Sequence, residues 1–362
     1  MRVLHVIARL NVGGTARYIT QLAQELPKHG VETFVATGFV QGAEIEDQST
    51  EGIDLIRIPS LARSLNPVKD HLARKQLEKI IAEVKPDIIH THTFKAGYIA
   101  RMKKLSVPVI HTFHGHLLDD PEFSGFKSKV IIEVERMLAK KSLRLVTVGR
   151  RVGDELLDHR IGHRSQYVNI PPGVVAINVT PRTEALKNLG IKFEGKPLVG
   201  WIARVTGVKN PMRALEVAKA MPETRFLIAG GGDLLEQVRA AAPSNVDVIG
   251  WAQAADVFGA CDIILSTSEN EGMPVALIEA QLAGKPVVAT DVGSVSEVIL
   301  NHETGIVTNK SAGSLVAALE PLVQSAIKRK EMGALAAARA HALFSVERMI
   351  NAHVELYKSI VK

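Results

Sequence analysis

The sequence of 362 residues has one cysteine and no long apolar run. The single Cys261 excludes an internal disulfide and a cysteine-rich metal site, which fits a reducing compartment. No apolar stretch approaches the roughly 20 residues that a membrane-spanning helix needs, and residues 3–7 are typical of a strand without a cleavage site. We therefore expect a cytoplasmic protein in which Cys261 has a structural role.

The dinucleotide-binding fingerprint G-x-G-x-x-G is also absent. Glycines follow predicted strands at Gly13-Gly14 and at Gly230-Gly231-Gly232, but neither group has the required spacing. This absence argues against a nicotinamide-dependent oxidoreductase. The backbone amides of Gly13, Gly14 and Thr15 at the start of a helix would still suit an anion, and a plain tight turn is the alternative interpretation.

What is present favours a globular protein of two domains. The chain is more than twice as long as a typical domain. Hydrophobic residues make up 46% and charged residues 23%, a balance that excludes disordered and collagen-like chains. Short β-branched runs alternate twice with longer helical patterns, which predicts two doubly wound α/β domains, residues 1–172 and residues 173–345.

The predicted elements form two series. The first has strands at residues 3–8, 33–36, 55–58, 88–90, 109–112 and 145–148, with helices at 16–29 and 68–84. The second has strands at 198–202, 225–229, 246–249, 263–266, 286–289 and 305–307, with helices at 211–220, 234–241, 274–283 and finally 346–360. Residues 167–173 contain Pro171-Pro172-Gly173 and predict a linker. Ligands of such domains bind at the carboxyl ends of the strands, so the cleft between the domains is the expected site.

The excess of positive over negative charge lies in the first half of the chain. Residues 1–175 carry 25 Lys and Arg against 19 Asp and Glu, whereas the rest of the chain carries 19 of each. The cations crowd at Arg101, Lys103, Lys104, Lys127, Lys129, Lys140, Lys141, Arg144, Arg150 and Arg151. This crowding indicates attraction to nucleic acid, acidic lipid or a phosphorylated substrate, and solvated helix faces are the alternative.

Two cations flank the loop after the predicted strand at residues 198–202. Arg204 follows this strand, and Lys209 precedes a helix that is expected to begin at Pro211. An arginine fork and a lysine point charge together suit a diphosphate. Each cation taken singly is equally typical of an exposed surface.

The loop after residues 263–266 carries the most informative motif. Pro274 is expected to start a helix whose N-terminal amides, at Gly272 and Met273, attract phosphate. Glu271 precedes this helix and Glu279 lies about one and a half turns into it, where both can accept hydrogen bonds from hydroxyls. The pattern indicates a ligand that joins a polyol to a phosphate, and capping or surface carboxylates are the alternative.

The spacing Glu271-x7-Glu279 resembles the E-x7-E motif of the family-4 retaining glycosyltransferases of the GT-B fold. The resemblance covers nearly the whole chain and is strongest over residues 198–307. It departs from the commonest pattern at Ala203-Arg204, where Gly-Arg is usual. Further matching segments are the Gly13-Gly14 loop, Gly284-Lys285-Pro286-Val287-Val288-Ala289 and Asp291-Val292-Gly293.

The resemblance implies a GT-B architecture in which residues 346–362 cross back and complete the first domain. It implies that the first domain binds the acceptor and that the second binds a nucleotide-sugar, with uridine as the expected base. Transfer would retain the anomeric configuration and need no metal or other cofactor. Closure of the two domains would exclude water and suppress hydrolysis of the donor.

The site residues that the resemblance implies fall into two groups. The catalytic group is Arg204 and Lys209, which hold the donor diphosphate, Glu271, which contacts the hydroxyls of the donor sugar, and His114, which lies beside the transferring sugar. The donor-binding group is Gly13, Gly14 and Thr15 near the diphosphate, Gly272, Met273 and Pro274 near phosphate or sugar, Glu279 at the ribose and Ile249 near the base.

Other histidines gather around His114. His111 and His116 lie on the same extended segment, and His90 and His92 lie at the end of the preceding strand. Imidazole is a good zinc ligand. However, alternation places His111 on the opposite side from His114 and His116, and no acidic or cysteine ligand stands at the usual short spacing. We therefore predict no metal site.

We predict a glycosyltransferase of a bacterial polysaccharide or glycolipid pathway that acts on a lipid-linked or otherwise anionic envelope acceptor, and no nucleic acid. Phe123 and Phe126 lie among Lys127 and Lys129, a combination typical of contact with an acidic membrane surface, and packing inside the domain is the alternative. A sugar-nucleotide epimerase and a non-catalytic nucleotide-sugar-binding protein are the competing functions. The oligomeric state is not predicted.

Overall fold

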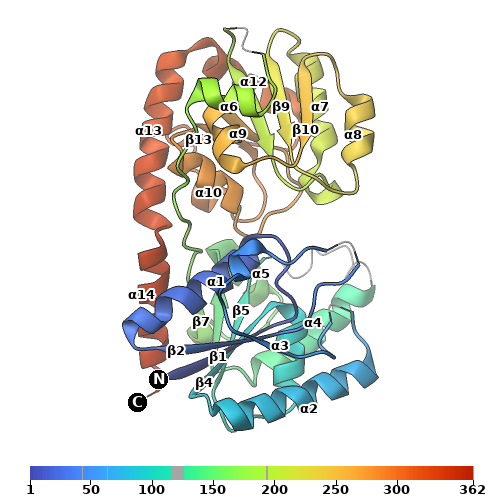
Figure 1. Ribbon diagram of the computed structural model, residues 1–362, viewed down its shortest axis with the longest axis vertical. Coiled ribbons are helices and arrows are strands. Elements are labelled where there is room, and N and C mark those ends of the chain that lie inside the picture. Colours follow the sequence, from blue (N-terminus) through green and yellow to red (C-terminus); the bar gives the residue numbers. More distant parts are fainter. Residues whose placement is uncertain (43, 63, 116–125, 193–194, 362) are drawn as a thin grey trace. The chain divides into compact units, whose positions relative to one another are not determined.

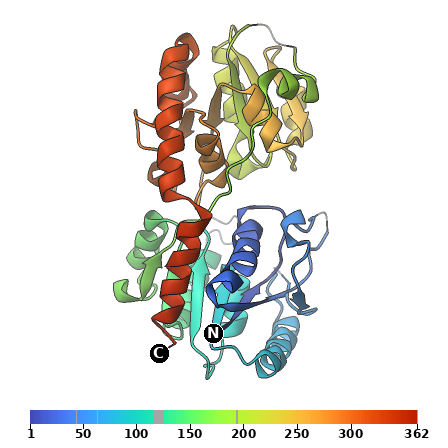
Figure 2. The same cartoon turned by 60° about the vertical axis from the view of Figure 1, so that its left-hand side comes forward.

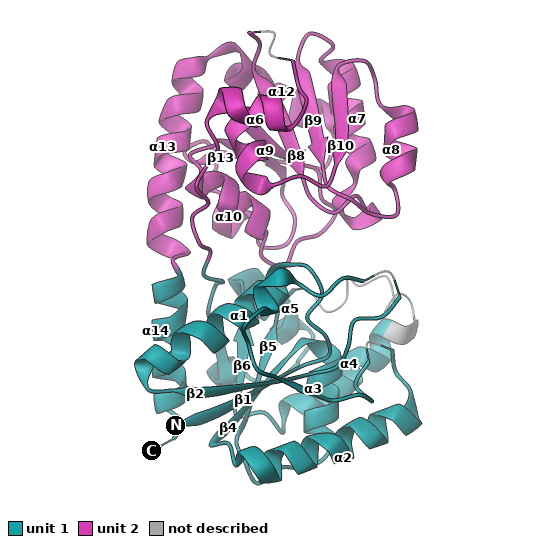
Figure 3. Cartoon of the chain, viewed as in Figure 1, with its two compact units in different colours: residues 1–173, 346–362 teal, residues 174–345 magenta. Residues whose placement is uncertain are grey.

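The computed structural model describes residues 1–361 apart from residues 43, 63, 116–125 and 193–194. The chain divides into two compact units, coloured separately in Figure 3: unit 1 comprises residues 1–173 and 346–362, and unit 2 comprises residues 174–345. Each unit has a parallel sheet with helices on both faces (Figure 1), so the predicted pair of doubly wound α/β folds is confirmed. Among the described residues, none of the helices combines the length and apolar character needed to cross a bilayer.

Unit 1 is built on a seven-stranded parallel sheet with the order β3-β2-β1-β4-β5-β6-β7. Its strands are β1 (Arg2–Ile7), β2 (Glu32–Thr37), β3 (Leu55–Arg57), β4 (Ile88–His92), β5 (Val109–Phe113), β6 (Arg144–Thr147) and β7 (Tyr167–Asn169). Every residue of β4 and β5 is buried, because helices cover both faces of the sheet. The linker predicted over residues 167–173 was wrong in its first part, since β7 pairs with β6 and is too short to show a periodic pattern.

The helices of unit 1 include several that the sequence patterns did not predict. They are α1 (Gly14–Glu25), α2 (Pro67–Val84), α3 (Thr93–Arg101), α4 (Phe126–Ala139), α5 (Arg150–Asp158) and α14 (Val346–Lys358), with 3-10 turns at Leu26–His29, Gln48–Thr50 and Arg164–Gln166. The helix predicted over residues 16–29 is α1 followed by a 3-10 turn, because Pro27 has no N–H to continue the α-helical ladder.

Helix α14 belongs to unit 1 although it is the last element of the chain, as the resemblance implied (Figure 2). It buries Met349 and Ile350 against the rest of the unit. Two polar contacts fix its rotation: His353 Nε2 lies 3.0 Å from the Tyr18 hydroxyl on α1, and the Tyr357 hydroxyl lies 2.7 Å from His90 Nδ1 on β4. Helix α14 therefore belongs to the same packed unit as β1 and α1, although it lies far from them in the sequence.

Unit 2 has a six-stranded parallel sheet with the order β10-β9-β8-β11-β12-β13. The strands are β8 (Leu198–Ile202), β9 (Arg225–Ala229), β10 (Val246–Gly250), β11 (Ile263–Ser266), β12 (Val287–Thr290) and β13 (Gly305–Thr308). The helices are α6 (Arg182–Asn188), α7 (Pro211–Ala220), α8 (Leu235–Ala241), α9 (Ala254–Ala260), α10 (Val275–Leu282), α11 (Val295–Val298), α12 (Ala312–Gln324) and α13 (Ala326–Leu343), with a 3-10 turn at Gly207–Lys209.

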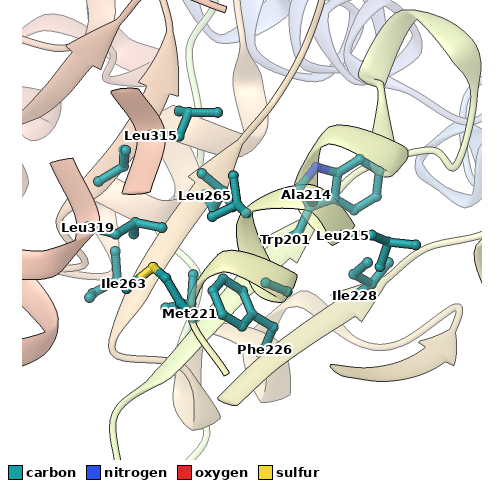
Figure 4. Packing of buried hydrophobic residues seen from close by; sticks show 14 of the residues in the cluster. Trp201, Ala214, Leu215, Met221, Phe226, Ile228, Ile263, Leu265, Leu315 and Leu319 are labelled. Carbon is teal, nitrogen blue, oxygen red and sulfur yellow. The ribbon is translucent and has the colours of Figure 1, made fainter. Parts of the chain in front are cut away.

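One hydrophobic cluster joins the sheet of unit 2 to the helices α7 and α12 (Figure 4). Trp201 and Leu265 come from the central strands, Leu215 from α7 and Leu315 from α12, and all four are at most 2% exposed. Burial of side chains of this size contributes about 1.5–3 kcal/mol each to folding. The cluster holds the central strands in place, and with them the loops that leave their carboxyl ends.

The strand order reverses at one place in each sheet. The reversal lies between β1 and β4 in unit 1 and between β8 and β11 in unit 2. Ligands of open α/β sheets bind outside the carboxyl ends of the strands at such points. The residues that we predicted as site residues stand there: Gly13-Gly14 follows β1, Arg204 follows β8 and Glu271 follows β11.

Candidate functional site

The loops after β8, β11 and β12 in unit 2 are tied to one another by side-chain hydrogen bonds. The Trp201 indole N–H donates to Thr267 Oγ1 over 2.9 Å, and this hydroxyl donates to the Asn210 carbonyl over 2.8 Å. Thr290 Oγ1 donates to the Ser268 carbonyl over 2.7 Å. The three strand ends therefore form one connected rim that carries the predicted diphosphate-binding and sugar-binding residues.

Lys209 and Glu271 meet on this rim. Lys209 Nζ donates to Glu271 Oε1 over 2.5 Å, and Ser268 Oγ donates to the same oxygen over 2.7 Å. The side chain of Glu271 is 10% exposed and that of Lys209 is 20% exposed, so water screens the pair only in part. The fold thus brings together the cation predicted for the diphosphate and the carboxylate predicted for the sugar.

Glu269 is a neighbouring carboxylate for which we predicted no role. It accepts hydrogen bonds from Asn210, Arg213 and Lys310. Burial opposes ionisation of Glu269, but these hydrogen bonds outweigh it and lower the pKa of the carboxyl to about 2. Glu269 therefore stays charged at neutral pH and holds the start of α7 to the loop after β11. Its place two residues before Glu271 was the only signal in the sequence.

Arg204 stands on the loop after β8 and is exposed. Beneath this loop Gly230 has a φ of +142°, and a Cβ atom there would lie 1.8 Å from the Ala203 carbonyl oxygen. Only glycine allows this close approach of the two loops. The glycine triplet after β9 thus serves packing, and it supports the backbone next to Arg204.

The segment Gly272–Pro274 leads into α10, and Pro274 occupies the N-cap position rather than the first helical residue. Gly272 is half-buried, whereas Met273 and Pro274 are buried. Glu279, in the middle of α10, is 8% exposed. The two carboxylates therefore differ in setting: Glu271 lies on the rim against Lys209, and Glu279 lies within the packed helix.

Ile249 lies near the end of β10 beside a cavity of about 500 Å³. Trp251, Asn188 and Gln253 also line this cavity. Trp251 is 68% exposed, and its indole covers Gly231, where a Cβ atom would lie 2.1 Å from the indole nitrogen. The position predicted for the nucleotide base therefore adjoins an open, partly aromatic hollow.

The Gly13-Gly14 loop of unit 1 precedes α1. Gly13 has a φ of +151°, which favours glycine, and its N–H donates to Asp47 Oδ2 over 3.1 Å. One of the backbone amides before α1 is therefore already hydrogen-bonded to a carboxylate of the protein itself. The anion site that we predicted here is reduced to Gly14 and Thr15, which form the first turn of α1.

His114 follows β5 and is the outermost of a row of imidazoles. His114 Nε2 lies 3.0 Å from His92 Nδ1, and His92 Nε2 lies 3.0 Å from His5 Nδ1. His111 stands apart, with its Nδ1 atom 2.8 Å from the Thr91 hydroxyl. His5 was not predicted as a site residue, because one polar residue within an apolar strand carries no periodic signal.

These imidazoles are uncharged at neutral pH. Burial and the nearby His353 lower the pKa of His5 and of His114 to about 3. Burial, with the histidines around it, also places the pKa of His92 well below its ordinary value. A neutral imidazole carries one ring hydrogen, so each of these rings has one donor nitrogen and one acceptor nitrogen.

Ring nitrogens of His5, His90 and His92 lie within 4.8 Å of one another, a spacing that admits a metal ion. However, each of their nitrogens already has a hydrogen-bond partner, except for His5 Nε2, which has none among the described residues. In the part of the chain that the structure describes, this group includes no carboxylate to balance the charge of a divalent ion. The contacts fit a hydrogen-bonded network, and His116 lies outside the described residues.

The basic residues of unit 1 differ in their exposure to solvent. Arg101 is fully buried and forms an ion pair with the buried Glu135 over 2.8 Å, so its predicted part in attracting an external anion was wrong. Lys103, Lys104 and Lys129 are exposed. Residues 116–125, which include Phe123, and the side chains of residues 126 and 127 lie outside the described part of the structure, and with them most of the predicted membrane contact.

Both units match known families. The model described as "Glycosyltransferase Family 4" matches residues 12–176, and the model described as "Glycosyl transferases group 1" matches residues 182–339. The chain is 25% identical to the UDP-Gal:alpha-D-GlcNAc-diphosphoundecaprenol alpha-1,3-galactosyltransferase of Escherichia coli, over 84% of this chain and 83% of that protein. It is 26% identical to the D-inositol 3-phosphate glycosyltransferase of Kineococcus radiotolerans, over 97% and 92% of the two chains.

The fold is shared with a sucrose-phosphate synthase from Thermosynechococcus elongatus, with a TM-score of 0.86 and 18% identity over 100% of this chain and 99% of that one. The two family models together span both units. The chain belongs to the family-4 glycosyltransferases of the GT-B fold. Its class of activity is therefore the transfer of a sugar.

Proposed function

We propose that this glycosyltransferase moves a sugar from a UDP-sugar to a lipid-linked or otherwise anionic envelope acceptor, with retention of the anomeric configuration and without a metal. The observation that carries the proposal is the contact between Lys209 and Glu271 beside the start of α10. It places a cation for phosphate next to a carboxylate for hydroxyls, and these are the two chemical groups that a sugar diphosphate joins.

Binding of the leaving group follows from this arrangement. The Arg204 fork and the Lys209 ammonium bind the diphosphate, and the amides of Gly272 and Met273 before α10 add their partial positive charge. These groups stabilise the negative charge that builds up on the diphosphate as the bond to the sugar breaks. Positive charge already fixed at this position replaces the metal ion that other diphosphate sites use.

Glu271 accepts hydrogen bonds from hydroxyls of the donor sugar, and Glu279 contacts the ribose. Since Glu271 is already held by Lys209 and Ser268, it orients the sugar rather than attacking it. The bond from the anomeric carbon to the diphosphate oxygen breaks, and the acceptor oxygen bonds to the same face of the sugar. The acceptor proton passes to an oxygen of the departing diphosphate, and His114 lies beside the sugar during transfer.

The acceptor is proposed from charge and from the names of relatives. Exposed lysines such as Lys103, Lys104 and Lys129 lie on unit 1, which carries the excess of positive charge. The two relatives named above act on a diphosphate-linked lipid and on an inositol phosphate, both of which are anionic, and one of them uses UDP-galactose. These names support an anionic acceptor and a uridine donor.

The deciding experiment starts with thermal stability in the presence of UDP, GDP and ADP. A ligand that binds only the folded state raises the unfolding temperature, and we expect UDP to raise it most. Transfer is then assayed with UDP-sugars and two acceptors, a polyprenyl-diphosphate saccharide and its uncharged alkyl glycoside. We expect free UDP only when the anionic acceptor is present, an α-linked product from an α-linked donor, and unchanged turnover in excess EDTA.

Other outcomes contradict separate parts of the proposal. Conversion of the donor sugar without any acceptor would indicate an epimerase, and stabilisation by UDP without turnover would indicate a binding protein. Inversion at the anomeric carbon would contradict retention. Activity that is lost in EDTA and returns with one divalent ion would contradict transfer without a metal.

A further inference from the structure

Three histidines from different segments of unit 1 lie on one face of its sheet. His5 stands on β1, His92 ends β4 and His114 follows β5. The parallel register pairs His5 with His90 and His92 with Thr112, and residues two apart on a strand point to the same face. This face is therefore common to His5, His92 and His114, and it is the one that α14 reaches through Tyr357.

The three rings are joined end to end. His5 Nδ1 lies 3.0 Å from His92 Nε2, and His92 Nδ1 lies 3.0 Å from His114 Nε2. The low pKa values described above leave one hydrogen on each ring. The neutral ring of His92, in the middle of the row, donates through one nitrogen and accepts through the other. Both hydrogen bonds therefore point in the same direction along the row.

The inner end of the row decides this direction. His5 Nε2 is buried and has no hydrogen-bond partner among the residues that the structure describes. If the bonds pointed inward, His5 Nε2 would be a buried N–H without an acceptor, whereas bonds that point outward leave only a bare ring nitrogen there. Among backbone groups, buried N–H donors without a partner are rarer than acceptors without one, and we expect the same of ring nitrogens. The outward direction makes His5 the donor to His92, and His92 the donor to His114.

We propose that His5 and His92 are positioning residues that keep His114 in the tautomer with its hydrogen on Nδ1. His114 Nε2 is then occupied as an acceptor, and Nδ1–H is the group that His114 offers as a hydrogen-bond donor to a sugar hydroxyl or a phosphate oxygen. The identity of that ligand rests on the proposed function, whereas the tautomer of His114 is inferred from the hydrogen bonds alone.

A second contact holds the ring of His114 from the side. His353 Nδ1–H donates to the Met349 carbonyl over 2.8 Å, so His353 Nε2 can only accept, and the Tyr18 hydroxyl donates to it over 3.0 Å. The Tyr18 ring meets the His114 ring edge-on, with centroids 4.9 Å apart and planes at 88°. Helix α14 thus fixes Tyr18, and Tyr18 limits rotation of the imidazole that His92 orients.

The first test reads the tautomer directly in the wild-type protein. Long-range ¹H–¹⁵N spectra of protein labelled at histidine distinguish protonated from bare ring nitrogens, and the resonances that disappear in His114→Gln assign His114. We expect hydrogen on Nδ1 and a bare Nε2 at neutral pH, both with and without UDP. Hydrogen on Nε2 would overturn the proposal.

The second test breaks the row at its far end. In His5→Asn the amide can still donate to His92, whereas His5→Leu cannot donate. We expect that His114 no longer has a single tautomer in His5→Leu, that kcat falls about tenfold and that the KM of the donor changes by less than about twofold. In His5→Asn we expect the tautomer of His114 and kcat to stay as in the wild type. The control is His111→Gln, a buried histidine outside the row, in which the tautomer of His114 stays as in the wild type.

The outcomes separate this proposal from the proposed function. An unchanged tautomer and kcat in a folded His5→Leu variant would overturn the positioning role while transfer stands. Absence of transfer in the wild type would overturn the proposed function, and the tautomer would still be decided by the spectra. If His5→Leu does not fold, the wild-type tautomer decides alone.

Discussion

At the scale of single residues, three cations on the rim of unit 2 are paired with carboxylates, and Arg204 on the same rim is exposed. Lys209 pairs with Glu271, and Arg213 and Lys310 pair with Glu269. Such pairs hold side chains in place before a ligand arrives, which reduces the entropy that binding costs. Substitution should therefore have different effects at Arg204, which is exposed, and at Lys209, which is already paired with Glu271.

Replacement of Arg204 by alanine tests the diphosphate contact. We expect kcat/KM to fall by an amount equivalent to about 2–4 kcal/mol of transition-state stabilisation, because one preorganised charged donor is removed. The unfolding temperature should stay unchanged, since Arg204 is exposed. Arg225 is the first residue of β9, at the amino ends of the strands and away from the rim at their carboxyl ends, and it supplies the control variant Arg225→Ala. Equal loss in both variants, or none in Arg204→Ala, would contradict the assignment.

Replacement of Lys209 by alanine has an additional cost in stability. It leaves the Glu271 carboxylate, which is 10% exposed, with Ser268 as its remaining side-chain partner, and we expect the free energy of unfolding to fall by about 1–3 kcal/mol. Adding Glu271→Gln removes the unpaired charge and should recover part of this loss. Urea denaturation of the single and double variants measures the coupling. Strictly additive effects would mean that the two side chains do not interact.

At the scale of elements, β1, β4 and β5 carry buried histidines where parallel strands usually carry aliphatic residues. Each ring is accommodated because a neighbouring strand or helix supplies a partner: Thr112 and Tyr357 contact His90, and His92 contacts His5. The core of unit 1 thus contains these polar contacts beside its apolar clusters. This makes the sheet sensitive to protonation.

The stability of unit 1 should fall in mild acid. Burial lowers the pKa of His5 and His114 to about 3 and that of His353 to about 4, against 6.5 in the unfolded chain. The unfolded state therefore binds more protons between about pH 6.5 and these lower values, and stability decreases as pH falls through this window. At pH 5 each histidine costs roughly 2 kcal/mol relative to pH 8.

Urea denaturation at pH 8 and at pH 5 measures this loss. The matched variant is His5→Asn, which removes one titrating ring and should reduce the difference between the two pH values by roughly 2 kcal/mol. A midpoint that is the same at both pH values would show that the buried rings do not take up protons on unfolding.

At the scale of the whole molecule, charge is distributed unevenly along the chain. The net charge of +6 arises within residues 1–175. Burial of Arg101 with Glu135 removes one cation from the surface, but Lys103 and Lys104 next to it are exposed. A positive surface of this kind attracts acidic lipid, with about 1 kcal/mol for each cation close to the membrane.

Flotation with lipid vesicles tests this attraction. We expect binding to vesicles that contain acidic lipid, little binding to neutral vesicles, and loss of binding as salt rises from about 50 to 500 mM, because salt screens the charges. The double variant Lys103→Gln/Lys104→Gln should bind less, and Lys187→Gln/Lys192→Gln in unit 2 should bind as the wild type does. Equal recovery with neutral and acidic vesicles at every salt concentration would leave a freely diffusing acceptor as the better interpretation.

Much of the fold and part of the site could be predicted from local sequence. Runs of β-branched residues marked β8, β9 and β11 with their observed bounds, because a strand that is buried on both faces is apolar throughout. The motif from Glu271 to Glu279 was visible because one loop and one helix contain it. The three-residue β7 and the helices α3–α6, α9 and α11–α13 were not predicted, since their patterns are short or mix apolar and polar positions.

The sequence by itself determined the two doubly wound units, the family and the positions after the strands where a ligand can bind, because these depend on short-range patterns and on the order of elements. Only the tertiary structure decided which side chains meet. It paired Lys209 with Glu271 across 62 residues and the Tyr18 hydroxyl with His353 across 335 residues. Such contacts depend on which strands become neighbours, and one polar side chain in an apolar strand or helix gives no periodic sign of its partner.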